Sequence, residues 1–119
     1  MTSVKSARIN CIAELNDQLR KNPLARSLGQ VLISSGNDTG GADFKAKVLT
    51  ALARMQTEDF KEANDPYGER DFNSFTVEAE ACFFKIDYYA EGDLCAPSGD
   101  PADREKTERV LTVMLADEY

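Results

Sequence analysis

The sequence predicts an α+β fold, a small antiparallel sheet of about three strands with helices packed chiefly on one face. Two amphipathic segments with apolar residues at helical spacing predict helices. Two neighbouring segments rich in aromatic and β-branched residues predict a hairpin. With 119 residues, 42% hydrophobic and 29% charged, the chain has room for one hydrophobic core. We therefore expect a single domain over residues 1–119.

The first helix is predicted from Ser3 to Lys21 and presents an apolar stripe to the core, with Arg20 lying off the stripe. The stripe comprises Val4, Ala7, Cys11, Ile12, Leu15 and Leu19. Asn22-Pro23 ends this helix, because a residue before proline is pushed out of the α region. The apolar run from Gln30 to Ser34 then predicts a buried strand. The glycine-containing loop after it matches no phosphate-binding fingerprint.

A second helix is predicted from Asp43, which fits the N-cap position, to about Gln56. Its buried face comprises Phe44, Val48, Leu52 and Met55. Further along, Asp71 to Val77 and Ala81 to Tyr89 predict two antiparallel strands joined as a hairpin. In the second strand Phe84, Ile86 and Tyr88 face the core. The opposite face, with Phe83, Lys85, Asp87 and Tyr89, is either covered by a helix end or exposed as a binding surface.

The C-terminal region is predicted to end in a third helix. Glycine and proline make the stretch from Ala90 to Gly99 an irregular loop. Asp100 then fits the N-cap position and Pro101 the first helical position of a helix that runs to about Asp117. Its buried stripe, which we expect to lie across the sheet, comprises Val110, Leu111, Met114 and Leu115.

The composition excludes several classes of site. The chain has no histidine, which removes Ser-His-Asp and Cys-His catalysis and every zinc site that uses imidazole. Its three cysteines are widely spaced, which favours reduced thiols over a disulfide framework; we expect Cys11 and Cys82 in the core and Cys95 in a loop, without the surroundings of a nucleophile. No segment resembles a membrane span or a signal peptide, so we expect a cytoplasmic location.

Charge is unevenly distributed along the chain, whose net charge is −7. Residues 1–57 carry 8 basic and 4 acidic side chains, whereas residues 58–119 carry 6 basic and 17 acidic ones. A surface of this sign repels nucleic-acid phosphates and anionic lipid, and it favours a basic protein surface or a cation. We therefore expect no direct nucleic-acid binding and no membrane binding. The structural alternative is that the acids only solvate the C-terminal half.

Three segments of the sequence are distinctive in combination. Residues 64–72 read NDPYGERDF, residues 84–89 read FKIDYY and residues 109–119 read RVLTVMLADEY. Together they resemble an uncharacterised bacterial family, catalogued as a domain of unknown function and found on mobile elements. The chain departs from the family pattern at Arg70 and Asn73, where the family has His and Gly, and at Phe84 and Ala90, where it has Trp and Asp. If that His were catalytic, this chain has lost it.

These observations predict a non-catalytic acidic module that binds a basic surface of a nucleic-acid-handling protein. By analogy of size, charge and mobile-element origin, it resembles inhibitors of the anti-CRISPR type, which occlude the nucleic-acid groove of a CRISPR effector. The predicted contact residues are Glu58, Asp59, Glu62, Glu78, Glu80, Glu91 and Asp93, with Tyr67 and Tyr89 as aromatic anchors. No cofactor is expected, and the oligomeric state is left open.

The alternative is a metal-binding or hydrolytic site on the loop from Asn64 to Asp71. Its carboxylates are Asp65, Glu69, Asp71 and Asp87, which supply hard oxygen ligands for Mg²⁺ or Ca²⁺ if they converge. Their spacing matches no metal-binding loop. In the structural interpretation Asn64 and Asp65 form an Asx-type turn, and Glu69, Arg70 and Asp71 pair with one another or with Lys85. We expect this second outcome, because Arg70 supplies a counter-charge inside the loop.

Overall fold

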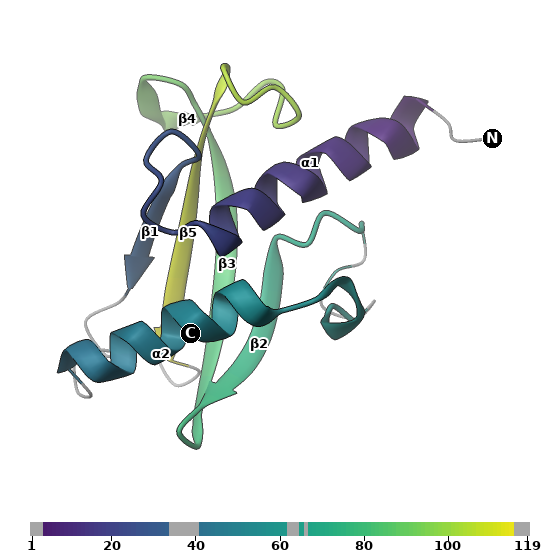
Figure 1. Ribbon diagram of the computed structural model, residues 1–119. Coiled ribbons are helices and arrows are strands. Elements are labelled where there is room, and N and C mark those ends of the chain that lie inside the picture. The colour runs from purple at the N-terminus through teal and green to yellow at the C-terminus, as the bar shows by residue number, and fades with distance from the viewer. Residues whose placement is uncertain (1–3, 34–40, 62–64, 66, 116–119) are drawn as a thin grey trace.

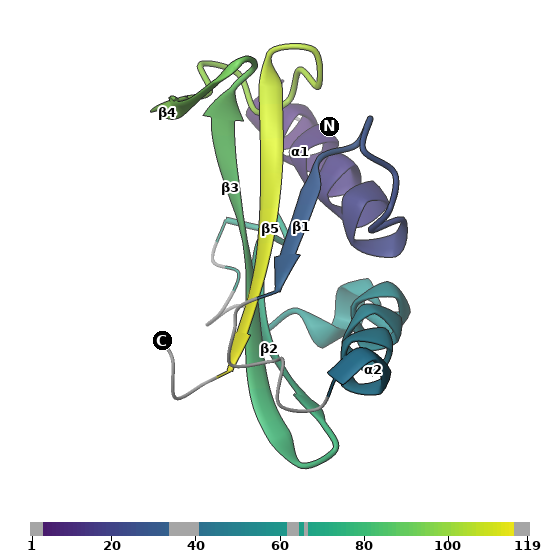
Figure 2. The ribbon, with the colours of Figure 1, turned by 90° about the vertical axis from the view of Figure 1, so that its left-hand side faces the viewer.

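The structure, a computed structural model, describes residues 4–33, 41–61, 65 and 67–115. Its elements in chain order are α1 Val4–Lys21, β1 Gln30–Ile33, α2 Gly41–Arg54, the 3₁₀ helix η2 Thr57–Asp59, β2 Phe72–Val77, β3 Glu80–Ala90, β4 Asp93–Pro97 and β5 Thr107–Leu115. The predicted α+β class is confirmed. Both helices lie on one side of the sheet, as Figures 1 and 2 show.

The sheet has five strands and is mostly antiparallel. Four of them lie in the order β1-β5-β3-β2, and β4 pairs with β3. Only the β1–β5 pair is parallel. The 11-residue β3 has β5 along one side; on the other, β2 pairs with its first half and β4 with its end, at Tyr89 and Ala90. β3 and β5 are therefore the central strands, because each pairs with other strands on both of its sides.

The two helices form where the apolar spacing predicts them, and neither is long and apolar enough to cross a membrane. The N-cap role predicted for Asp43 is wrong, because α2 begins at Gly41 and Asp43 lies inside its first turn; the helix ends at Arg54, before the predicted Gln56. The predicted face of α2, with Phe44 and Leu52 among its members, is buried in the core. On α1 the stripe is displaced: Ile12 and Leu19 are buried as predicted, but Ala7 is exposed. Arg20, placed off the stripe by the sequence, is only 1% exposed.

The β2–β3 hairpin is confirmed, with a turn of two residues between the strands. Both turn residues, Glu78 and Ala79, have positive φ angles of 50° and 69°. A turn with two left-handed residues matches the natural twist of a hairpin, although asparagine and glycine adopt it more easily. As predicted, Phe84 and Ile86 point into the core under the helices.

The predicted C-terminal helix is wrong, because its residues form the central strand β5. Short apolar runs do not distinguish a helix from a buried strand, and Val110, Leu111, Met114 and Leu115 fit both periods. β-branched residues and partners on both sides favour the strand, which pairs with β1 and β3. The N-cap role of Asp100 fails with the helix: its carbonyl accepts a hydrogen bond from Asp103 N at 2.9 Å within a turn.

The stretch from Ala90 to Gly99 is also more regular than predicted, because it contains β4. Cys95 lies on that strand and is exposed. Of the two cysteines expected in the core, Cys82 is buried and Cys11 is only partly buried. The predicted glycine-containing loop after β1 lies outside the described residues.

Gly29 allows β1 to approach β5 closely. Its φ angle is 145°, and a Cβ atom built on it would lie 2.6 Å from the carbonyl oxygen of Arg109. A side chain at this position would therefore push β1 away from the backbone of β5, so the parallel pair needs glycine at its entrance.

Leu111→Asp is expected to abolish cooperative unfolding, because Leu111 is 0% exposed at the centre of β5. An unpaired carboxylate there costs several kcal/mol, against a typical total stability of about 5 to 15 kcal/mol. Thermal unfolding followed by circular dichroism checks this. Thr112→Asp, a change on the opposite face of the same strand, is the control and should still unfold cooperatively. A sharp transition near the parent temperature for Leu111→Asp would contradict this account of the core.

Candidate functional site

A network of buried polar side chains joins α1 to the sheet. Asn16, which is 0% exposed on α1, donates from Nδ2 to the Tyr88 hydroxyl at 2.8 Å and to the Glu69 carbonyl at 3.0 Å. The Tyr88 hydroxyl in turn donates to Glu69 Oε1 at 2.9 Å. Asn16 Oδ1 accepts from Arg109 Nε at 2.9 Å. Every polar atom of the Asn16 side chain therefore has a partner, as a buried amide requires.

Arg109 of β5 connects the segment between β4 and β5 to this network. Its guanidinium lies 5.3 Å from the centre of the Tyr88 ring and donates to the Pro101 carbonyl, in the segment between β4 and β5. Burial lowers the pKa of Arg109, while Tyr88, Cys11 and Glu69 oppose that effect. Burial also raises the pKa of Tyr88, so its phenol stays neutral and able to donate.

A second group of contacts centres on Asp17 of α1. Arg70 forms a two-pronged ion pair with it, with Nη2 at 2.7 Å from one oxygen and Nε at 3.0 Å from the other. Arg20 Nη2 donates to the same carboxylate at 2.8 Å. Burial alone would raise the pKa of Asp17, but the hydrogen bonds from Arg70 and Arg20 outweigh it and lower the pKa below its usual value.

Arg20 connects α1 to the end of α2. Its Nη1 donates to the carbonyls of Leu52 at 2.7 Å and Met55 at 2.9 Å, which the last turn of a helix leaves without partners. A cation there also meets the negative end of the helix dipole. The guanidinium lies 5.4 Å from the Phe60 ring centre. These contacts stabilise a charged side chain in the core, although Arg20 Nε is buried without a hydrogen-bond partner among the described residues.

Two hydrogen bonds to Asp65 hold the residues from Tyr67 to Arg70 in a turn. Gly68 N donates to the Asp65 carbonyl at 3.2 Å, and Arg70 N donates to Asp65 Oδ1 at 3.0 Å. Arg70 has a φ angle of 53°, a left-handed conformation unusual for a residue with a side chain. That conformation accompanies its ion pair with Asp17. At the tip, Tyr67 is 76% exposed.

Asp71 follows this turn, and its carboxylate has an unusual pKa. Burial, together with nearby Glu69, Asp65 and Asp87, raises the pKa of Asp71 to about 6, and a hydrogen bond to its own backbone only partly opposes the shift. A carboxyl group with such a pKa is partly protonated near neutral pH. A shifted pKa of this kind occurs both at catalytic sites and in structural networks of charged groups.

The C-terminal three-quarters of the chain match a known family model. Residues 33–118 match the family described as protein of unknown function (DUF3768). The chain belongs to this family. Comparisons with curated proteins and with solved structures found no match. The expected membership of an uncharacterised family is confirmed, and the family description names no activity. Tyr88 and Arg109 lie inside the matched stretch, whereas Asn16 and Asp17 lie outside it.

The structure does not arrange the four predicted carboxylates as a ligand set. Glu69 accepts from Tyr88, and Asp87 Oδ2 lies 3.0 Å from Lys85 Nζ. Asp65 accepts from the backbone of Arg70. The other three, Asp65, Glu69 and Asp87, remain close enough to raise the pKa of Asp71. Within the described part of the chain, no group of three or more carboxylates and thiols is placed to hold a metal ion.

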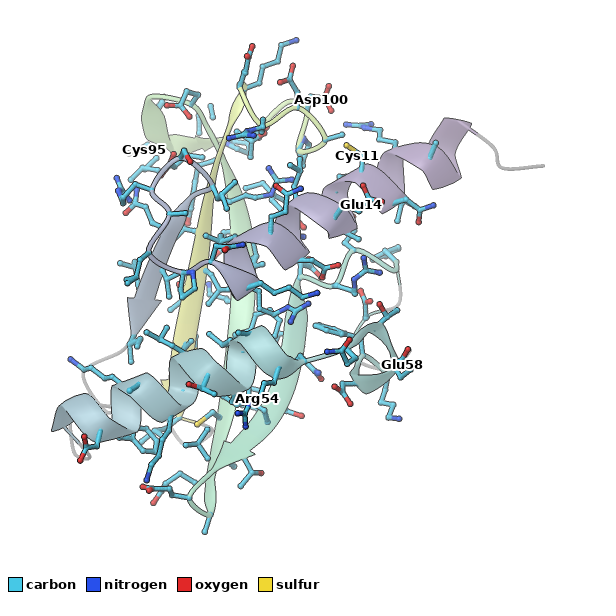
Figure 3. All side chains as sticks on the ribbon, in the orientation of Figure 1. Cys11, Glu14, Arg54, Glu58, Cys95 and Asp100 are labelled. Carbon is cyan, nitrogen blue, oxygen red and sulfur yellow. The ribbon has the colours of Figure 1, made fainter. Side chains whose placement is uncertain are left out.

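The predicted partner-binding residues lie in separate places. Glu58 and Asp59 are exposed on η2, and Figure 3 shows Glu58 there. Glu78 and Glu80 lie at the β2–β3 turn, and Glu91 and Asp93 at the opposite end of β3, roughly 30 Å away by the rise of a strand. Tyr89 is only partly exposed, and Glu62 lies outside the described residues. No single face carries the whole set.

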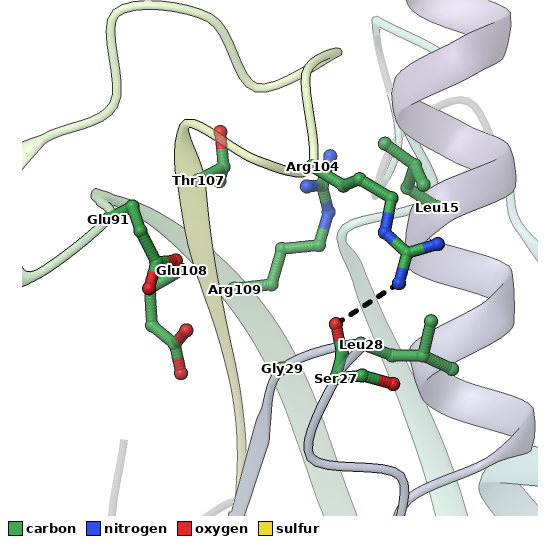
Figure 4. A pocket seen from close by; sticks show the side chains of 9 residues that line it. All are labelled: Leu15, Ser27, Leu28, Gly29, Glu91, Arg104, Thr107, Glu108 and Arg109. Carbon is green, nitrogen blue, oxygen red and sulfur yellow. Dashed lines mark hydrogen bonds between the residues drawn. The ribbon is translucent and has the colours of Figure 1, made fainter.

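A small cavity lies between α1, the start of β1 and β5 (Figure 4). Its volume is about 30 Å³, and Arg104 and Arg109 line it together with Glu91 and Glu108. Arg104 also donates to the Ser27 carbonyl at 3.4 Å across its edge. This volume suits about one water molecule, so the cavity cannot serve as a substrate pocket.

The sequence did not identify the buried network, although one signal was present. Asn16 and Arg20 follow Ile12 at steps of four, so they occupy the buried face of α1. Likewise Arg109 alternates with Leu111 and Val113 on the inner face of β5. Polar residues at core positions indicate partners elsewhere in the fold, but the sequence does not say which.

Asp71→Asn is expected to raise the free energy of unfolding at pH 7, by roughly 1 to 3 kcal/mol. The pKa of Asp71 is about 6 in the folded protein and near 3.8 otherwise. Between pH 4 and 6 the folded state therefore binds more protons than the unfolded state, and stability falls as the pH rises through that window. The gain from Asp71→Asn should shrink towards zero near pH 4.

Chemical denaturation at pH 4, 5, 6 and 7 measures this difference. Glu105→Gln, which neutralises an exposed acid, serves as the control and should change stability by less than about 0.5 kcal/mol. An effect of Asp71→Asn that is the same at every pH would show that Asp71 titrates normally.

Proposed function

We propose that this protein is a non-catalytic acidic module that binds a basic surface of a nucleic-acid-handling protein. The observation that carries the proposal is Tyr67, which is 76% exposed at the tip of a fixed turn. Tyrosine is among the residues that dominate binding energies at protein interfaces, because its ring buries a large area at a small entropic cost. An exposed tyrosine on an ordered turn fits the role of an anchor.

The turn that presents Tyr67 is held from both sides. Arg70 attaches it to Asp17 on α1, and the Glu69 carbonyl accepts from Asn16 on the same helix. Beyond the turn, Ile86 N donates to the Asp71 carbonyl at 2.8 Å and so attaches the chain to β3. A loop already fixed in its bound conformation loses less entropy on association, which strengthens binding.

Acidic side chains flank this turn. Glu58 and Asp59 are exposed on η2. Two residues after η2, the Lys61 carbonyl accepts a hydrogen bond from Asp65 N at 2.9 Å, which brings this segment to the turn. Glu14 is exposed on α1, close enough to Arg70 to influence its charge. The nearby cation Arg70 is already occupied by Asp17. The surroundings of Tyr67 therefore favour a basic partner.

The positions of Tyr67 and the nearby acids support a contact surface smaller than the set of partner-binding residues that the sequence predicted. It comprises Tyr67, Glu58 and Asp59. The acids at the two ends of β3 lie too far apart to share one contact of ordinary size. Their contribution is the long-range field of a chain with net charge −7, which speeds encounter with a basic partner.

The most specific form of the proposal is an inhibitor of the anti-CRISPR type that occludes the nucleic-acid groove of a CRISPR effector. Small size and the charge of −7 support it, by analogy alone. In this form the acids substitute for nucleic-acid phosphates. The partner is therefore a protein whose basic groove also binds DNA or RNA, and the two ligands compete.

Immobilised protein is expected to capture nucleic-acid-handling proteins from a bacterial lysate, and purified CRISPR effectors in particular, in about 50 mM salt. Capture should fall steeply in about 300 mM salt, because the pairing charges are screened. Tyr67→Ala and the double change Glu58→Lys with Asp59→Lys should each reduce it by tenfold or more, which corresponds to about 1.4 kcal/mol. Quantitative mass spectrometry and gel-shift competition measure the two effects.

Leu24→Ala is the matched control, because it removes a side chain that is 86% exposed on a different surface. This variant should capture the same proteins as the parent. Recovery of no nucleic-acid-handling protein at either salt concentration, or equal recovery by Tyr67→Ala, would exclude the proposal.

A carboxylate-based metal-binding or hydrolytic function is the second candidate, and the pKa of Asp71 near 6 favours it. Isothermal calorimetry with Mg²⁺, Mn²⁺ and Ca²⁺ discriminates the two. The binding-module proposal predicts no heat of binding up to millimolar ion, because Glu69 and Asp87 already have other partners. Saturable binding that Asp71→Asn removes, and that Glu105→Gln leaves intact, would support the second candidate instead.

A further inference from the structure

A shallow groove runs between α2 and the outer edge of β2. Its volume is about 370 Å³, and it is lined by Lys47, Thr50, Ala51 and Arg54 of α2 and by Thr76 and Val77 of β2. Figure 1 shows the end of α2 beside β2, and Figure 3 shows Arg54 on that helix. β2 lies at the end of the strand order, so no other strand of the described residues covers its outer side.

The register of the hairpin shows which backbone groups point outwards. Ile86 N donates to the Asp71 carbonyl, so these two residues form a hydrogen-bonded pair. In an antiparallel ladder such pairs alternate with pairs whose backbone groups point away from each other. Counting along the register, Asn73, Phe75 and Val77 bond towards β3. The N–H and C=O groups of Ser74 and Thr76 therefore point to the outer edge.

One of the outward backbone groups of this edge already has a hydrogen-bond partner. Ser74 N donates to Asn73 Oδ1 at 3.0 Å, and Asn73 Nδ2 donates to the Asp59 carbonyl at 3.1 Å, so η2 closes the upper end of the strand. Beside the groove, Thr76 is exposed. The carbonyl of Ser74 and both backbone groups of Thr76 thus remain as a short template for another strand.

The helical wall of the groove is cationic, in contrast to the acidic chain as a whole. The exposed guanidinium of Arg54 makes no ion pair with any described residue. Lys47 is paired with Glu78 at the hairpin end of the groove. Thr50 and Thr76 add polar groups to a lining that also includes Ala51 and Val77. A ligand with an extended backbone, apolar side chains and at least one negative charge therefore matches this groove.

We propose that this groove binds an extended acidic peptide segment of a partner protein, added as a strand to the edge of β2. The peptide backbone pairs with Thr76 and the Ser74 carbonyl, and a carboxylate side chain pairs with Arg54. This mode, strand addition beside a helix, takes affinity from the main chain and specificity from side-chain contacts. A second copy of this chain fits less well, because two β2 edges would bring two copies of Arg54 together.

This site has the opposite charge preference to the Tyr67 surface. The two surfaces adjoin, because η2 carries Glu58 and Asp59 and also closes the upper end of the β2 edge through Asn73. Arg54 and Tyr67 lie on different segments, so Arg54→Gln and Tyr67→Ala each change one surface only. The protein would then hold a basic partner at Tyr67 and an acidic segment at α2 and β2, which amounts to an adaptor with two contacts.

Two synthetic heptapeptides test the proposal, one of alternating valine and glutamate and one of alternating valine and glutamine, which is neutral and so is not attracted to the acidic surface. Fluorescence anisotropy in low salt should show the glutamate peptide binding at least about tenfold more tightly. Arg54→Gln should weaken its binding by roughly fivefold, as loss of an exposed charge pair does. Thr76→Pro should weaken it by tenfold or more, because proline removes the outward N–H.

Thr76→Val is the matched control, because it removes the hydroxyl and keeps the backbone N–H; it should bind like the parent. In the parent protein, hydrogen exchange at the Thr76 amide should slow when the glutamate peptide binds, which decides the matter even if Thr76→Pro fails to fold. Equal affinity for both peptides, no binding at millimolar concentration, or an unchanged Thr76 amide would overturn the proposal. So would a dimer that Thr76→Pro dissociates, since the edge would then belong to a second copy.

Discussion

The burial of charged and polar side chains under α1 is the constraint on which the rest of the structure depends. Asn16, Arg20 and Arg109 are almost completely removed from water. A buried amide or guanidinium is tolerated only when its hydrogen bonds are replaced. The replacements come from distant parts of the chain: Glu69 and Tyr88 for Asn16, the end of α2 for Arg20 and the segment before β5 for Arg109. α1 therefore has one favourable position on the sheet.

The same contacts determine where the loops lie. Asp17 receives Arg70 and Arg20 together, so one carboxylate connects the turn before β2 to the helix that carries it and, through Arg20, to α2. The turn then presents Tyr67 outwards in a defined orientation. Asp71, next to that turn, lies among other carboxylates at some cost in stability, because burial and like charges both disfavour its ionised form.

Charge is segregated on the outside of the molecule. Acids gather at η2 and at both ends of β3, and the described part of α2 carries Lys45, Lys47 and Arg54 against one acid, Asp43. We propose that this protein, with its net charge of −7 and a local cationic groove, binds two kinds of partner. Membership of a family described as a protein of unknown function leaves that question to binding experiments.

The sequence by itself determined the α+β class, both helices, β1 and the β2–β3 hairpin. In α2 and the hairpin local periodicity and global burial agree: Phe44, Val48 and Leu52 recur at helical steps, and Phe84 and Ile86 alternate along a strand. β1 forms where predicted but is not the buried strand that its apolar run indicated, because it lies at the end of the strand order and Leu32 is 50% exposed.

Only the tertiary structure decided the state of residues 107–115, the partners of the buried arginines and the edge of β2. The apolar pattern of β5 fits a helix as well as a strand, and its neighbours β1 and β3 select the strand by pairing on both sides. The contacts from Asn16 to Tyr88 and from Arg109 to Asn16 span 72 and 93 residues. Local pattern carries no information over such separations, because the pairing depends on which elements pack together in space.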